Sequence, residues 1–137
     1  MKNHLRIGLL LFCFSQTVLG SEECFNYNNQ VVTLMGRVTL RTFFGPPNYG
    51  ESPKTDSRET QAVLLLDKPV CTLANPKDYD DPENNQKEIT LVPAADMKLS
   101  SYSGKLVSVQ GTLFHANTGH HHTPILMSVQ TLTVQGK

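Results

Sequence analysis

The chain has 137 residues, with twelve basic and twelve acidic side chains, and its formal net charge at pH 7 is zero. Proteins that grip phosphate backbones usually carry a basic excess, so this balance disfavours a nucleic-acid partner. The length suits one domain built around one hydrophobic core.

The N-terminus has the pattern of a secretory signal peptide. Lys2 and Arg6 form a basic start, a short apolar run follows, and small residues precede a cleavage point after Gly20. The run is too short to span a membrane. We therefore expect residues 1–20 to be removed, which leaves one domain over residues 21–137, without a membrane span, in the periplasm or secreted.

Two cysteines remain after this cleavage, Cys24 and Cys71. An even pair in an exported chain most often forms a disulfide, which stabilises a fold by roughly 2–4 kcal/mol. The alternative, a reactive thiol pair, lacks the Cys-x-x-Cys spacing.

Residues 31–44 read VVTLMGRVTLRTFF and alternate between apolar and polar side chains. Period two predicts a strand with one buried face, formed by Val32, Leu34, Val38, Leu40 and Phe44. Gly36 interrupts the strand, as glycine does at a bulge or a sharp bend. Residues 45–57 contain three prolines and two glycines and are expected to form a loop.

Residues 59–71 form a second predicted strand, whose continuous apolar run indicates burial on both faces and whose Pro69 limits pairing near its end. An acidic loop follows, and residues 87–92 form a short third strand. Residues 93–104 begin with proline and end with glycine, which favours one or two helical turns.

Residues 105–115 and 124–134 alternate again and complete a set of five strands, with Gly111 at a second expected bend. Five strands with a helix between the third and fourth predict a mainly β fold, a small OB-like Greek-key barrel. A flat sandwich is the alternative and would normally have about seven strands. In the barrel, Cys24 precedes the first strand and Cys71 ends the second, so an antiparallel pair brings the two cysteines together.

In an OB barrel, the loops between strands one and two and between strands four and five flank the usual ligand face. Here these loops are FFGPPNYGESPKTDS, residues 43–57, and HANTGHHHTP, residues 115–124. We expect them to lie beside one face of the barrel.

The second loop holds four of the five histidines of the chain, namely His115, His120, His121 and His122. Three interpretations remain open: a solvated hairpin, a pH-sensitive contact with a partner, or a zinc or copper site. In the metal hypothesis His115, His120 and His122 converge, His121 points away, and Asp56 or Glu59 adds a carboxylate. Neither an HExxH helix nor a cysteine ligand supports it.

The first loop holds Phe43, Phe44 and Tyr49 around two prolines, which stiffen a loop and reduce the ordering cost of binding. Phe43 and Tyr49 are available to stack on a ligand or partner. Alternatively, Phe44 and Tyr49 plug the end of the barrel.

Catalytic motifs are not found in the sequence. It has neither a Gly-x-Ser-x-Gly nucleophile elbow nor an apparent carboxylate pair, so we expect neither an enzyme nor a resident cofactor. The acidic stretch DYDDPEN at 78–84 lacks the central glycine of an EF-hand loop and is interpreted as a solvated loop.

With these motifs in view, the chain resembles the bacterial domain of unknown function 4431 family, DUF4431. The resemblance runs from Cys24 to Val134 and is carried by TFFGPPNYGE, LLLDKPVC, KEITLV and GTLFHANTGHHHTPILM. It implies a small exported protein of Gram-negative bacteria and transfers no catalytic or binding residue. One departure is Phe44, where related chains often have proline.

The sequence thus predicts an exported binding module that uses Phe43, Tyr49, His115, His120, His121 and His122 as one recognition face. Its partner would be another protein or a cell-envelope polymer. The alternative is an envelope metal-binding protein that holds zinc or copper through His115, His120 and His122.

Overall fold

The computed structural model describes residues 23–136, and the signal peptide expected at residues 1–20 lies outside this range. The described chain forms six strands and one 3-10 turn: β1 (Glu23–Phe25), β2 (Val31–Phe44), β3 (Arg58–Thr72), β4 (Gln86–Val92), η1 (Leu99–Tyr102), β5 (Leu106–His115) and β6 (Ile125–Val134).

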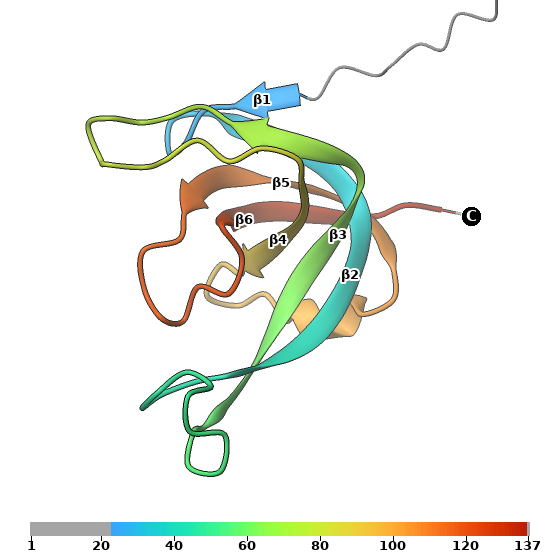
Figure 1. Cartoon of the computed structure of the whole chain (residues 1–137). Coiled ribbons are helices and arrows are strands. Elements are labelled where there is room, and N and C mark those ends of the chain that lie inside the picture. The colour runs from blue at the N-terminus through green and yellow to red at the C-terminus, as the bar shows by residue number, and fades with distance from the viewer. Residues whose placement is uncertain (1–22, 137) are drawn as a thin grey trace, which may run out of the picture.

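Five of these strands close into a barrel (Figure 1). Around the ring, β2 pairs with β3, β3 with β4, β4 with β6, β6 with β5, and β5 with β2. The β4–β6 pair is parallel and the other four are antiparallel. This is an OB-like Greek-key barrel, which confirms the fold predicted from the sequence.

The helix expected between the third and fourth barrel strands is a single 3-10 turn, Leu99–Tyr102, and no α-helix forms in that stretch. Serine side chains compete with helical hydrogen bonds by bonding to nearby backbone groups. Here the Ser101 hydroxyl donates to the Lys98 carbonyl at 2.8 Å. The turn still buries Leu99, which is 6% exposed, against the core.

The inward faces of the strands fill the barrel as their alternation predicts, with Val38, Leu64, Val107 and Leu113 completely buried. Leu40 is the exception, because its exposed fraction is 40%. Leu40 pairs with Ala62, the last residue of β3 that pairs with β4, and its side chain faces a surface pocket. Phe44 is half-buried and lies under the guanidinium of Arg58, 3.7 Å from the ring centroid.

Beyond the barrel, β2 and β3 continue as a two-stranded ribbon, which we call the arm (residues 41–44 and 58–61). The β2–β3 pairing extends to Phe44 and Arg58, whereas the β3–β4 pairing ends at Ala62 and Leu91. The arm therefore projects from one end of the barrel (Figure 1).

Both glycines expected at bends lie where the backbones approach closely. A Cβ on Gly111 would lie 2.1 Å from the Ser128 carbonyl oxygen, at a register shift in the β5–β6 pairing. A Cβ on Gly36 would lie 2.2 Å from the Leu65 oxygen. Any larger residue at either position would force the strands apart.

A disulfide joins Cys24 and Cys71, as predicted, but the strand geometry differs from the expectation. Cys24 belongs to a strand of its own, β1, which pairs with β3 in parallel and sets Cys24 opposite Cys71. The three-residue strand β1 is too short to give a periodic pattern in the sequence. Within residues 23–136, no helix is long and apolar enough to cross a membrane.

The disulfide should contribute strongly to stability because it closes a long loop, its cysteines being 47 positions apart. Replacing both cysteines by serine should lower the free energy of unfolding by about 2–4 kcal/mol in denaturant titrations. An unchanged midpoint and slope would contradict this account of β1 as a covalently fastened strand.

Candidate functional site

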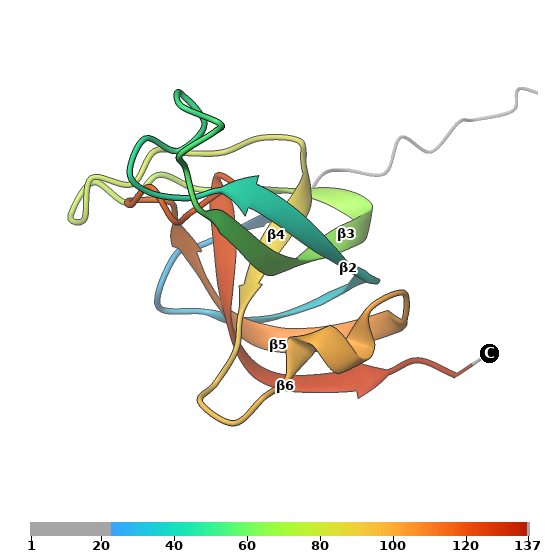
Figure 2. The same ribbon diagram turned by 90° about the horizontal axis from the view of Figure 1, so that it is seen from below.

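The two loops expected to form one face do lie together. Loop 45–57 follows β2, loop 116–124 follows β5, and both occupy the same side of the barrel in two perpendicular views (Figures 1 and 2). The rings of Tyr49 and His120 meet edge to face, with centroids 5.6 Å apart. The Tyr49 hydroxyl also lies 3.4 Å from His120 Nε2. Gly119 packs under the Tyr49 ring, where a Cβ would come within 2.6 Å.

The carboxylate of Glu59, on the arm, binds two imidazoles of the histidine loop. Its Oε1 lies 2.5 Å from His120 Nδ1 and its Oε2 lies 3.0 Å from His122 Nε2. An ionised carboxylate only accepts, so both imidazoles donate N–H to it. The hydrogen bond from His122, reinforced by His120, holds the pKa of Glu59 below its ordinary value despite partial burial.

The remaining nitrogen of His120 faces the first loop. In the neutral tautomer that carries its proton on Nδ1, Nε2 is an acceptor to which the Tyr49 hydroxyl can donate. Glu59, His120 and Tyr49 therefore form one chain of polar contacts that runs from the arm to the tip of the first loop.

The histidine loop lies against one face of the arm. Phe43 and Glu59 are opposite each other in the β2–β3 register and point to the same face. The ring of Phe43 stacks on His122, with centroids 4.3 Å apart and planes inclined by 7°. Gln61, two residues along on that face, donates from Nε2 to the His120 carbonyl at 2.8 Å.

His121 turns inward within its own loop. Its Nδ1 accepts a hydrogen bond from the Asn117 N–H at 3.0 Å, and its ring meets Phe114 edge to face. Burial, followed by the neighbouring His120 and His122, lowers the pKa of His121 below its ordinary value. The neutral ring that this favours is the form able to accept from Asn117.

His115 does not join the other histidines. It lies at the end of β5, where its Nε2 contacts Glu83 Oε1 at 3.1 Å and its ring meets Tyr27 edge to face. The convergence of His115, His120 and His122 expected for zinc or copper is therefore not formed. No group of three His, Cys, Asp or Glu side chains within residues 23–136 is arranged to hold a metal.

Asp56 shapes the first loop instead of reaching the imidazoles. Its carboxylate accepts hydrogen bonds from three backbone N–H groups, those of Asn48, Gly50 and Ser52, at 2.8–3.1 Å. Burial acts to raise the pKa of Asp56, but these hydrogen bonds outweigh it, and the pKa lies below its ordinary value. The same bonds hold Tyr49 at φ 50°, a left-handed conformation unusual for a residue with a side chain.

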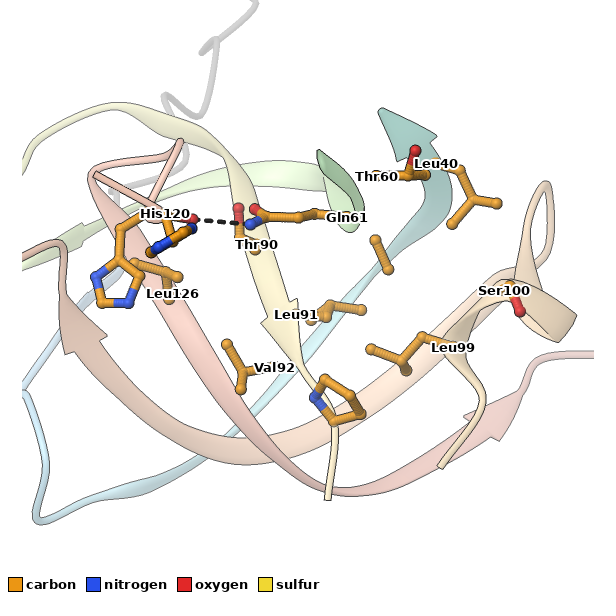
Figure 3. Close-up of a pocket in the computed structure, with 13 residues that line it drawn as sticks. Leu40, Thr60, Gln61, Thr90, Leu91, Val92, Leu99, Ser100, His120 and Leu126 are labelled. Carbon is orange, nitrogen blue, oxygen red and sulfur yellow. Dashed lines mark hydrogen bonds between the residues drawn. The ribbon is translucent and has the colours of Figure 1, made fainter. Parts of the chain in front are cut away.

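A pocket of about 390 Å³ opens beside this cluster, at the root of the arm (Figure 3). Its walls are apolar toward the barrel and carry imidazole at the loop end. The lining residues are Leu40, Thr60, Gln61, Ala62, Thr90, Leu91, Val92, Pro93, Leu99, Ser100, His120, His121 and Leu126.

Residues 88–133 match the model of a family described as Domain of unknown function (DUF4431). We call residues 88–133 the DUF4431 segment because they are similar to this family. This confirms the family resemblance predicted from the sequence, over a shorter range than the resemblance covered. No curated protein and no solved structure matches the chain. The DUF4431 segment contains the histidine loop, whereas Tyr49 and Glu59 lie outside it.

Two features of the site went unrecognised in the sequence. The sequence indicates Glu59 only as a candidate metal ligand, although its position opposite Phe43 follows from strand alternation once the hairpin register is known. The pocket depends on Leu99, whose approach to the root of the arm has no local sequence signal.

Replacing Glu59 by glutamine should destabilise the fold in a pH-dependent way. Because the pKa of Glu59 is lowered by folding, its contribution is complete above the unfolded carboxyl pKa, about 4.3, and is lost as pH falls through the folded pKa. The variant should therefore be less stable by about 0.5–1 kcal/mol near pH 6–7 and should approach the parent below about pH 4.

Denaturant titrations from pH 3 to pH 7 measure this difference. The control is Glu51→Gln, which removes the same charge from an exposed position in loop 45–57. Equal pH profiles for the two variants would show that Glu59 does not hold the histidine loop.

Proposed function

We propose that the protein is an exported interaction module whose recognition surface is formed by loops 45–57 and 116–124, here called the loop face. Its target is another protein or a polymer of the cell envelope. The observation that carries the proposal is the direct contact between Tyr49 and His120. This contact makes two loops that are distant in sequence into one surface, at the usual ligand position of an OB barrel.

The loop face is both preorganised and accessible. Asp56 fixes the first loop through three backbone hydrogen bonds, and Glu59 fixes the second through His120 and His122. A surface that is already ordered loses less conformational entropy on binding. Tyr49 nevertheless remains 41% exposed, and tyrosine is a frequent anchor in protein interfaces.

Metal binding is the weaker candidate for this site. His120 and His122 are engaged by Glu59, and His115 is engaged by Glu83 on another part of the barrel. We therefore propose recognition of a partner rather than a zinc or copper site.

Export to an oxidising compartment is supported by the Cys24–Cys71 disulfide and by the N-terminal pattern of basic and apolar residues. We expect the exported protein to begin at Ser21. N-terminal sequencing of protein recovered from the periplasm and the medium tests this, and a product that retains Lys2 would contradict it.

Replacing Tyr49 by alanine should remove the exposed anchor and weaken binding of the envelope partner at least tenfold, the effect expected for an interface hot spot. Affinity capture from an envelope extract with immobilised mature protein identifies the partner, and titration of that partner measures the loss. Tyr79→Ala is the matched control, because Tyr79 is 92% exposed and belongs to the acidic loop. Equal binding by the parent and both variants would contradict the proposed loop face.

A further inference from the structure

The arm leaves one edge of β3 open. Residues 58–61 pair with β2 on one side, but the pairing of β3 with β4 ends at Ala62. Beyond that point β4 stays with β6 through the pairs Leu91–Met127 and Val92–Ser128. Pro93 then removes the next backbone donor of the β4 chain. Among the residues that the structure describes, no strand occupies this edge.

The local hydrogen bonds show which groups face the open edge. Ser57 donates to the Pro46 carbonyl and accepts from the Gly45 N–H, so both its backbone groups point toward the β2 side. Backbone groups alternate in direction along a strand, and those of Arg58 and Thr60 therefore point toward the open side. The neighbouring strand β4 shows the alternation that this assignment requires, because the N–H of Thr90 donates to Thr123 Oγ1 and not to β3.

The 390 Å³ pocket runs along this edge (Figure 3). On the barrel side its wall is apolar, with Leu40, Leu91 and Leu99. On the loop side it carries His120 and His121. None of the lining residues is Asp, Glu, Lys or Arg, so the pocket suits an uncharged occupant.

We propose that the open edge of β3 takes up an extended, uncharged peptide segment as an additional strand. The occupant must offer donors and acceptors at the two-residue spacing of Arg58 and Thr60, and a polypeptide backbone has this repeat. Alternate side chains of the added strand would face the leucine wall and the imidazole wall. The inference names the class of partner that the loop face receives, and it rests on the proposed function.

The test uses the acetylated and amidated pentapeptide Thr-Leu-Thr-Leu-Thr, titrated into the isotopically labelled mature protein and followed by NMR. We expect a Kd below about 1 mM, with the Thr60 amide among the resonances that shift most. Two analogues are N-methylated, one at both leucines and the other at the threonines. Only one of these two sets of N–H groups can face β3, so one analogue should lose at least about fivefold in affinity.

The protein variants form a matched pair. Thr60→Pro removes the N–H at the open edge, whereas Thr60→Val keeps the backbone and the side-chain shape, and both lose the hydroxyl contact with Thr42. Thr60→Pro should bind the pentapeptide at least about fivefold more weakly than Thr60→Val. The N-methylated analogues test the same backbone contact in the parent protein, so the result does not depend on how Thr60→Pro folds.

Failure of strand addition can be distinguished from failure of the loop face. The absence of pentapeptide binding below about 1 mM, or equal affinity for the pentapeptide and both N-methylated analogues, overturns strand addition. If Tyr49→Ala still weakens binding of the envelope partner in that case, the proposed function stands without it. If neither experiment shows an effect, both proposals are wrong.

Discussion

The carboxylate of Glu59, bonded to His120 and His122, is the interaction on which the arrangement of the site depends. Each loop has its own internal order, the first through Asp56 and the second through the bond between Asn117 and His121. Internal order alone does not determine where two loops lie relative to each other. Glu59 supplies that relation because it projects from the arm, a two-stranded ribbon continuous with the barrel.

The topology of the barrel explains why the single carboxylate of Glu59 is sufficient to hold the two loops together. The OB connection places the β2–β3 and β5–β6 loops at the same end, and the length of β2 and β3 carries the first loop outward as an arm. The histidine loop then has a firm surface to lie on, where His122 stacks on Phe43 and Gln61 bonds to the backbone of His120. The early end of the β3–β4 pairing leaves the pocket between this loop and η1.

The strands and their order could be predicted because their alternation is clear, and five strands of this kind close in few ways. The proximity of the two loops followed from that topology. The partner of each histidine could not be predicted, because three consecutive histidines show no alternation from which the direction of each side chain could be inferred. His115, placed with the other histidines by its position in the sequence, instead meets Glu83 from a loop whose path has no sequence signal.

The other differences have equally local causes. Leu40 continues the apolar alternation of β2, but alternation does not reveal where the neighbouring strand ends. The expected helix has proline and glycine at its two ends, but Ser101 bonds to the Lys98 carbonyl and only the 3-10 turn η1 forms. For Leu40 the end of the neighbouring strand decided the outcome, and for the helix a hydrogen bond within the turn did so.

The central claim is that Glu59 holds the two loops in contact, and nuclear Overhauser spectroscopy of the mature protein at neutral pH tests it most directly. The account predicts cross-peaks between the ring protons of Tyr49 and His120 and between those of Phe43 and His122. If the rings are assigned and both sets of cross-peaks are absent, the two loops are independent of each other and the account is contradicted.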